Sequence, residues 1–242
     1  MEPVLFYGNH AASSFGSIVA LEWLGQPYRL FRLDLPGDTK TDFYTHLNPA
    51  QKVPALLLEN GKTLTESAAI LHHLAWRDRS KGLTYDQGTP EFDHLNQVLA
   101  FVNTDYWSSF APAFEAFDMD LKGEKDPSVQ KMLRDIGRKG VAKAHAALEA
   151  MIGDGKWLAG DRRTIADAYF AGIARWVPFL ASTGAKMVDQ RDYPKLYRHI
   201  QKLETDPAVI FAHAIEDDKP AKSAGGFLGH VSLEDIKPRL KV

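Results

Sequence analysis

The strongest constraint on the fold is a hairpin signal in the segment VPALLLENGKTLT, which begins at Val53. Asn60 and Gly61 separate two apolar runs, and both residue types tolerate the positive φ angles of a tight turn. Residues 53–58 and 62–64 are therefore predicted to form two antiparallel strands. The segment that follows, residues 67–76, is predicted to be a helix.

Residues 1–77 as a whole predict an α/β domain with one mixed sheet. Before the hairpin, β-prone runs alternate with apolar residues at helical spacing, which gives the order β-α-β-α-β-β-α. The first two strands flank a helix, so we expect them to be parallel with a right-handed crossover. The predicted strands are residues 3–7 and 28–33, and the predicted helices are residues 17–24 and 41–46.

The sequence changes character after residue 77. Residues 78–90 are polar and rich in turn residues, which is typical of a linker, and strand signals then disappear. Residues 91–216 therefore predict an all-helical domain. The predicted helices are 91–117 with a bend near Pro112, 127–152 after an Asp126 cap, 164–180, 193–203 and 207–215. Residues 217–242 form a C-terminal tail without a clear period, which either wraps over the body of the protein or stays mobile.

Charge and composition exclude several classes of function. The formal net charge of −2 gives no electrostatic case for nucleic acid binding. No apolar run approaches the roughly 20 residues of a membrane span, and no signal peptide precedes the first strand, so we expect a cytoplasmic protein without membrane contact. The nine histidines show no metal-ligand spacing, so we expect no metal.

The chain contains no cysteine. This excludes disulfides, thiolate metal sites and a cysteine nucleophile. Any thiol chemistry must therefore use a thiol that a ligand brings.

Two motifs in this layout resemble the cytosolic glutathione transferases. NPAQKVPALLLENGKTLTESAAI, from Asn48, is similar to the glutathione-binding segment of that family, and WLAGDRRTIADAYF, from Trp157, is similar to its helix-capping motif. The start, LFYGNHAASS, looks most like the bacterial beta-type members. The resemblance implies a thioredoxin-like α/β N-terminal domain followed by an all-α C-terminal domain, which together make the glutathione transferase fold.

The resemblance also implies a glutathione site in the first of these motifs. In thioredoxin-like folds the Val53–Pro54 bond is cis, and Val53 then offers its N–H and C=O groups to a peptide ligand as an added strand. Glu66 and Ser67 begin a helix, whose free N–H groups bind a carboxylate. By resemblance they hold the γ-glutamyl group. Lys52 is a candidate partner of the glycyl carboxylate, although a lone lysine is more often a solvated surface charge.

The sequence leaves open which residue activates the glutathione thiol. When LFYGNHAASS is laid on beta-type members, their cysteine falls at Ala12, and the catalytic serine of plant-type members falls there too. Alanine cannot donate a hydrogen bond to a thiolate. Ser13 and Tyr7 are the two leading candidates, His10 is the third and Ser14 the fourth.

Aromatic residues along the predicted helix 91–117 suggest the wall of a co-substrate site. Tyr106, Trp107 and Phe110 are the candidates, with Trp176 and Phe227 as weaker ones, although aromatic residues at helical spacing are more often core.

The function implied by the resemblance is attack of the glutathione thiolate on a hydrophobic electrophile. The implied co-substrate is glutathione, and the implied assembly is a homodimer. Two alternatives remain open: a non-catalytic binding or scaffold protein on the same fold, and a specialised glutathione-dependent lyase, dehalogenase or isomerase. Without a cysteine, glutaredoxin-like reduction of disulfides is not expected.

Overall fold

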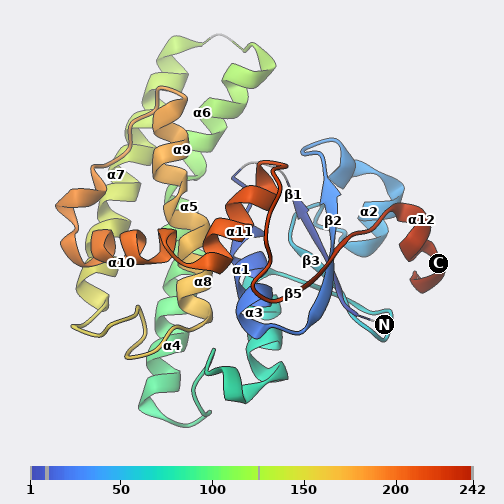
Figure 1. Ribbon diagram of the computed structural model, residues 1–242. Helices are drawn as coiled ribbons and strands as arrows, with labels where there is room; N and C mark the ends of the chain where they lie inside the picture. Colours follow the sequence, from blue (N-terminus) through green and yellow to red (C-terminus); the bar gives the residue numbers. More distant parts are fainter. Residues whose placement is uncertain (1, 9–10, 125, 241–242) are drawn as a thin grey trace.

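In the computed structural model, which describes residues 2–8, 11–124 and 126–240, five strands form one mixed sheet (Figure 1). Their order across the sheet is β4-β3-β1-β2-β5. The β1 strand runs parallel to β2, as the predicted crossover requires, and antiparallel to β3. The strands are β1 (Val4–Gly8), β2 (Pro27–Leu33), β3 (Ala55–Leu57), β4 (Thr63–Thr65) and β5 (Gly226–His230).

The alternation of side chains along β1 builds two cores, one on each face of the sheet. Leu5 and Tyr7 belong to the large core that continues into the helical domain, while Val4 and Phe6 belong to a smaller core. Helices α1 (Phe15–Leu24) and α3 (Ser67–Arg77) cover the first face, and α2 (Asp42–Leu47) and α12 (Leu233–Ile236) cover the second (Figure 1).

The predicted hairpin is present, and its turn explains the Asn-Gly pair. Gly61 has a φ angle of 81°, which is costly for residues with a Cβ atom. The Asn60 side chain accepts a hydrogen bond from the Lys62 N–H at 3.0 Å. The β3 and β4 strands then pair antiparallel from Leu57–Thr63 to Ala55–Thr65.

The C-terminal tail wraps over the body of the protein, which settles the alternative that its sequence left open. Its strand β5 pairs in parallel with β2 and gives the sheet an extra edge strand (Figure 1). The buried carboxylate of Glu22, on α1, accepts hydrogen bonds from Ser223 Oγ at 2.7 Å, Ala224 N at 2.7 Å and Gly225 N at 2.9 Å. These bonds fix the tail where it enters the strand.

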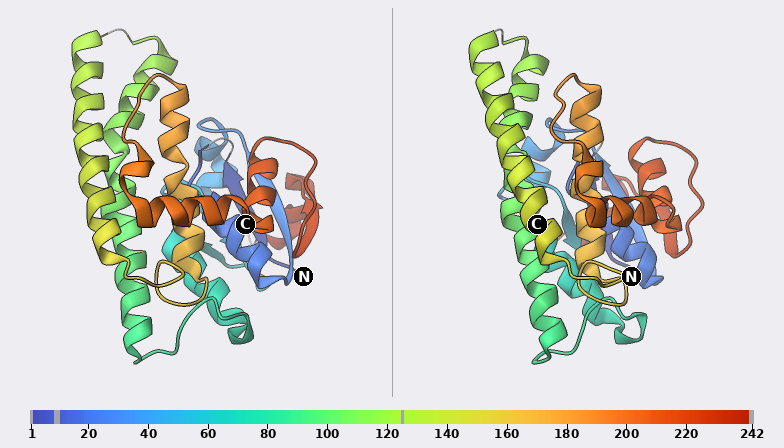
Figure 2. Two further views of the ribbon diagram at one scale, coloured as in Figure 1. Left: turned by 60° about the vertical axis from the view of Figure 1, so that its left-hand side comes forward. Right: turned by 90° about the vertical axis from the view of Figure 1, so that its left-hand side faces the viewer.

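The helical domain lies on the α1–α3 side of the sheet, and its long α6 and α7 helices run side by side (Figure 2). Its helices are α4 (Pro90–Phe101), α5 (Trp107–Ser109), α6 (Ala111–Lys122), α7 (Pro127–Met151), α8 (Ile165–Ala174), α9 (Trp176–Ser182), α10 (Pro194–Glu204) and α11 (Pro207–Glu216). A π-helical turn, η3 (Val102–Tyr106), joins α4 to α5. Single 3-10 turns lie at η1 (Asp38–Lys40), η2 (Arg79–Lys81), η4 (Gln190–Asp192) and η5 (Lys237–Arg239).

Two helices predicted to be continuous are broken in the structure. The predicted helix 91–117 divides at the η3 turn and again before α6. Pro112 lies in the first turn of α6, where its missing N–H group costs no intrahelical hydrogen bond. The predicted helix 164–180 divides at Arg175. Pro178 has no N–H to donate to the carbonyl of Ala174, and the Gln190 side chain donates to that carbonyl instead, at 3.0 Å.

The capping box predicted at Thr164 and Asp167 is present at the start of α8. The fully buried Asp167 carboxylate accepts hydrogen bonds from Thr164 N at 2.7 Å, Leu158 N at 2.9 Å and His199 Nε2 at 2.7 Å. Asp167 therefore joins α8 to α10 as well as capping its own helix.

The two domains meet where α1 packs against α8 and α11. Gly16 and Gly172 let the α1 and α8 backbones approach closely, since a Cβ atom on Gly16 would lie 2.7 Å from the carbonyl oxygen of Ala168. Across the described residues, each helix is too short or too polar to span a lipid bilayer.

Candidate functional site

A small cavity with polar walls lies between the two domains and gathers most of the predicted ligand-binding residues. Its volume is about 150 Å³. We call it the polar cavity, and it is lined by Ser13, Asn48, Lys52, Val53, Pro54, Glu66, Ser67, Asn103, Trp107 and Tyr169. All five predicted glutathione-binding residues are among them.

Hydrogen bonds hold the Lys52–Val53 segment in place before β3. The Lys52 carbonyl accepts from the Tyr44 hydroxyl and from the Asn48 side chain, both at 2.7 Å. The Val53–Pro54 peptide bond is cis, as the resemblance implies. The segment therefore reaches the cavity with its backbone conformation already fixed.

Glu66 and Ser67 stand at the N-terminus of α3, on another wall of the polar cavity. Glu66 is exposed and has a φ angle of 69° and a ψ angle of 122°, outside the regions that L-residues favour. Ser67 is 6% exposed. The free N–H groups of the first helical turn give this wall a positive potential that favours a carboxylate.

Asn103 and Tyr169 complete the polar cavity, and the sequence analysis missed both. The Tyr169 hydroxyl donates to Asn103 Oδ1 at 3.0 Å. Burial raises the pKa of Tyr169 to about 12, against the lowering effect of a hydrogen bond with Ser67, so its hydroxyl stays protonated at neutral pH. The capping box could have pointed to Tyr169, which follows Asp167 by two residues and lies in the second turn of α8, the helix that meets α1.

A larger cavity adjoins the polar cavity and has mainly apolar walls. Its volume is about 460 Å³, and we call it the apolar cavity. It is lined by Ala11, Ala12, Ser13, Leu35, Pro36, Thr39, Gln51, Lys52, Val53, Trp107, Ala111, Phe114, Glu115, Asp118 and Trp176.

The two cavities share a short boundary. Ser13, Lys52, Val53 and Trp107 line both of them. The Ser13 hydroxyl donates to the Val53 carbonyl at 3.0 Å, and Lys52 supplies a cationic side chain beside it. The arrangement can hold a polar ligand on one side of Ser13 and an apolar molecule on the other.

Comparisons with known proteins agree with this geometry. The family described as "Glutathione S-transferase, N-terminal domain" matches residues 14–76, and "Glutathione S-transferase, C-terminal domain" matches residues 107–207. Glutathione S-transferase GST-4.5 of Xanthomonas campestris pv. campestris is 31% identical over 170 residues, which cover 70% of this chain and 80% of that protein. The chain belongs to the glutathione S-transferase family.

Two further relatives extend the likeness over most of the chain. A maleylacetoacetate isomerase of Pseudomonas aeruginosa is 28% identical over 221 residues, which cover 90% of this chain and 99% of that protein. The solved structure of a sphingomonad glutathione S-transferase complexed with glutathione has a TM-score of 0.73 and 27% identity, and covers 88% of this chain and 98% of its own. These relatives confirm the fold predicted from the sequence.

Tyr7, one of the two leading candidates for thiol activation in this glutathione transferase, lines neither cavity. Its side chain is 1% exposed, and its hydroxyl pairs with His230 Nε2 of β5 at 2.9 Å. Burial raises the pKa of Tyr7 to about 12. The structure therefore does not bring Tyr7 to the predicted site, because the tail strand and the large core enclose its side chain.

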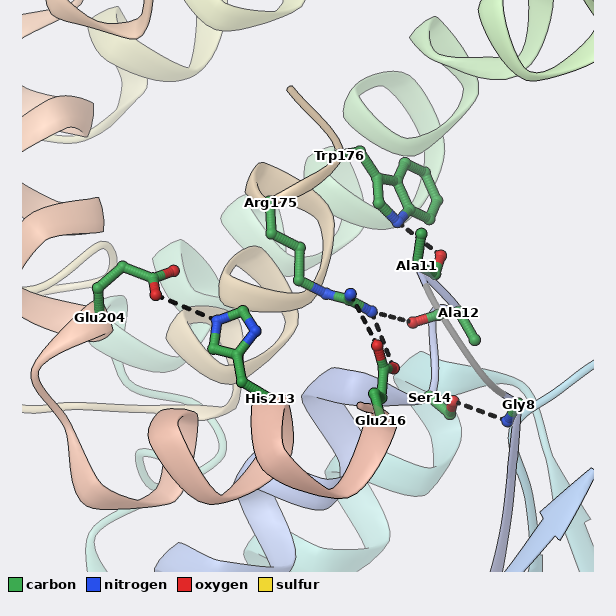
Figure 3. Close-up of polar contacts among 9 residues, drawn as sticks. All are labelled: Gly8, Ala11, Ala12, Ser14, Arg175, Trp176, Glu204, His213 and Glu216. Carbon is green, nitrogen blue, oxygen red and sulfur yellow. Dashed lines mark hydrogen bonds and ion pairs between the residues drawn. The ribbon is translucent and has the colours of Figure 1, made fainter. Parts of the chain in front are cut away.

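Of the remaining candidates for thiol activation, Ser13 lines both cavities and Ser14 lines neither. Ser13 lies at the boundary of the two cavities. Ser14 is fully buried, and its hydroxyl accepts a hydrogen bond from Gly8 N at 3.3 Å, so it shapes the turn (Figure 3). His10 lies outside the described residues.

Of the predicted co-substrate wall, Trp107 lines both cavities and Trp176 lines the apolar one. The prediction that Tyr106 and Phe110 belong to this wall is wrong, because both side chains are fully buried and line neither cavity. Tyr106 pairs with His145 Nε2 at 3.1 Å, and Phe110 packs edge-on against Tyr106.

Phe227 also lies away from the site. It belongs to β5 and packs against Tyr28 and Phe211. Phe114, which the sequence analysis did not choose, contributes to the apolar wall and packs against Trp176 at a ring distance of 4.9 Å. Among the described residues, no group of three or more metal-binding side chains is close enough together to hold a metal ion.

Proposed function

We propose that this glutathione transferase binds glutathione in the polar cavity and directs its thiolate at a hydrophobic electrophile in the apolar cavity. The single observation that carries the proposal is the shared boundary, where Ser13 and Val53 line both cavities. A ligand with a peptide backbone beside Val53 would bring its sulfur close to this boundary. The solved sphingomonad relative was complexed with glutathione, which supports the same ligand here.

In this proposal the Ser13 hydroxyl is the group that stabilises the thiolate. A free thiol has a pKa near ~8.5, and lowering it by about 2 requires roughly 2.7 kcal/mol of stabilisation that acts only on the anion. The hydroxyl now donates to the Val53 carbonyl and would turn toward the sulfur when glutathione binds. The Lys52 charge and the N-terminal turn of α1 add positive potential at the same place.

Conjugation then follows from the geometry of the two cavities. The thiolate attacks the electrophilic carbon, a carbon–sulfur bond forms, and the leaving group departs with its electron pair. The walls of the apolar cavity, including Trp107 and Phe114, would bind the hydrophobic part of the electrophile.

The test is the ultraviolet absorbance of bound thiolate as a function of pH in the native protein and in Ser13→Ala. We expect the variant to bind glutathione and to raise the pKa of the bound thiol. An unchanged thiol pKa in Ser13→Ala would overturn the role of Ser13. Failure of the native protein to bind immobilised glutathione would overturn the whole proposal.

A second candidate function is a glutathione-dependent isomerase. The observation that favours it is the Pseudomonas aeruginosa maleylacetoacetate isomerase, which aligns with this chain over 99% of its own length. Conjugation consumes one glutathione for each product, whereas an isomerase returns glutathione unchanged. Measuring glutathione consumption against product formation therefore separates the two candidates.

A further inference from the structure

Side chains of the helical domain form hydrogen bonds with the backbone of the loop that carries Ser13. Trp176 Nε1, at the start of α9, donates to the Ala11 carbonyl at 2.7 Å. Arg175 Nη2 donates to the Ala12 carbonyl at 2.8 Å (Figure 3). The carboxylate of Glu216, at the end of α11, accepts from the N–H of Ala11. The backbone on both sides of Ala11 is thus held by side chains that are distant in sequence.

Arg175 and Glu216 also form a buried, two-point ion pair. Arg175 Nη1 lies 2.8 Å from Glu216 Oε2, and Nη2 lies 2.9 Å from Oε1 (Figure 3). The side chains are 10% and 2% exposed, and the guanidinium lies over the ring of Phe15 at 4.2 Å. A buried ion pair gains little net stability, because both charges lose their hydration. Its geometry is therefore the better guide to its role.

The loop needs outside support to keep its conformation. Ala11 has a φ angle of 62°, which residues other than glycine rarely adopt. Such a conformation costs about 1–3 kcal/mol and persists only where surrounding contacts enforce it. Ser13 follows two residues later, and its hydroxyl lies where the two cavities meet.

We propose that Arg175, Trp176 and Glu216 are positioning residues that fix the Ala11–Ala12 backbone and thereby hold the Ser13 hydroxyl at the boundary of the two cavities. The inference rests on the proposed role of Ser13. Arg175 and Glu216 line neither cavity, so their effect on the bound thiol must pass through the loop that they hold. Trp176 also presents its ring to the apolar cavity, but its N–H faces the loop.

The alternative is that the three side chains only stabilise the domain interface. Trp176→Phe separates the two roles, because it keeps an aromatic ring, although a smaller one, in the apolar cavity and removes the N–H that bonds Ala11. Trp23→Phe is the matched control. It removes an indole N–H bond of 3.0 Å to Asp206 at the same domain interface, away from the loop.

The measurement is the pH titration of bound glutathione thiolate without any electrophile, together with thermal unfolding of each variant. For Trp176→Phe we expect the ionised fraction of bound thiol at pH 7 to fall about three- to tenfold, the equivalent of one hydrogen bond. For Trp23→Phe we expect a similar loss of thermal stability and no change in the thiol titration. Equal effects of the two variants on the thiol would overturn the inference.

A double variant tests whether the effect passes through Ser13. In a Ser13→Ala background, Trp176→Phe should cause no further change in the thiol titration, because the hydroxyl that it positions is gone. If the two changes add fully, the positioning role is wrong, whereas the role of Ser13 stands. If Ser13→Ala alone leaves the thiol pKa unchanged, the proposed function of Ser13 fails, and this inference fails with it.

Arg175→Lys provides a second, independent variant. Lysine keeps a positive charge beside Glu216 but lacks the planar fork that reaches both Glu216 and the Ala12 carbonyl. We expect it to shift the thiol titration in the same direction as Trp176→Phe. A folded Arg175→Lys protein with an unchanged titration would remove Arg175 from the set.

Discussion

At the residue scale, the backbone conformation of Glu66 lowers the stability of the fold but places the N-terminus of α3 at the polar cavity. Its backbone, with φ 69° and ψ 122°, costs about 1–3 kcal/mol for a residue with a Cβ atom. The carboxylate is exposed, and α3 begins at the next residue. The conformation turns the chain so that Ser67 and the helix N-terminus face the polar cavity. We expect the Glu66 carboxylate to contribute to ligand binding rather than to folding.

Glycine and alanine at this position should therefore differ in stability but not in binding. Both Glu66→Gly and Glu66→Ala remove the carboxylate, so we expect each to weaken glutathione binding about tenfold, measured by titration calorimetry. Glycine adopts a positive φ without strain, so Glu66→Gly should be the more stable of the two by about 1 kcal/mol in urea unfolding. Equal stability of the two variants would show that the backbone is not strained.

His145 is a second residue whose environment sets a measurable property. Its Nδ1 donates to the Val141 carbonyl at 2.9 Å, and its Nε2 accepts from the Tyr106 hydroxyl at 3.1 Å. Burial lowers the pKa of His145 to about 4. The unfolded chain binds a proton near pH 6.5, whereas the folded protein binds it only near pH 4.

The free energy of unfolding should therefore fall as the pH drops below 6.5. For this group we expect a loss of about 2 kcal/mol between pH 7.5 and pH 5. His145→Gln cannot titrate, so its loss of stability over the same range should be smaller by that amount in urea unfolding. The variant will be less stable at both pH values, but only the difference between them tests the prediction. An identical pH dependence in both proteins would contradict it.

At the element scale, the tail strand depends on one carboxylate. Glu22 lies inside the α1 helix, is 4% exposed, and bonds the backbone of Ala224 and Gly225. The Tyr28 hydroxyl, on the neighbouring strand β2, also donates to it. One side chain thus joins α1, β2 and the start of β5.

Glu22→Gln should weaken this junction because the amide turns a donor toward backbone N–H groups. We expect the free energy of unfolding to fall by about 2–4 kcal/mol and limited proteolysis to cut faster after residue 217. Glu204→Gln is the control, since its carboxylate pairs with His213 at the surface and should matter by less than about 1 kcal/mol. Equal cleavage in both variants would contradict the role of Glu22.

Local chemistry explains which parts the sequence could predict. The hairpin and the capping box depend on neighbouring residues, and both are present in the structure. The cis Val53–Pro54 bond is also present, but only the family resemblance implied it. Tyr7 and Tyr106 were misjudged because their directions depend on partners far along the chain, His230 and His145. The β5 strand was missed for the same reason, since an edge strand of five residues pairs only after the rest of the sheet exists.

At the scale of the whole molecule, the site depends on how closely two helices cross. Ser13 precedes α1, and Tyr169 belongs to α8, so the walls of the polar cavity move with these helices. Gly16 and Gly172 allow contact between the two backbones at the crossing. A change in the distance between the two domains should therefore also change the width of the polar cavity.

Gly16→Ala should disturb both properties at once. Its Cβ atom would lie 2.7 Å from the carbonyl oxygen of Ala168 and 2.9 Å from the Cα atom of Tyr169, so the helices must move apart. We expect a loss of about 1–3 kcal/mol in urea unfolding and weaker glutathione binding. Gly153→Ala is the control, because nothing lies within 4 Å of its Cβ position. If Gly16→Ala is destabilised but binds glutathione as the native protein does, the shape of the polar cavity does not depend on the contact between α1 and α8.

The parallel pairing of β5 with β2 has a consequence for synthesis on the ribosome. Pro27 pairs with Gly226, so about 200 further residues must be synthesised before the open edge of β2 can be paired. At ordinary translation rates this takes roughly 10–40 s. During that time the edge is available to other nascent chains. Arg29 and Arg32 lie on this strand, and charged side chains are the common protection of an unpaired edge. We therefore expect the two arginines to oppose pairing of this edge with other chains until β5 has been synthesised.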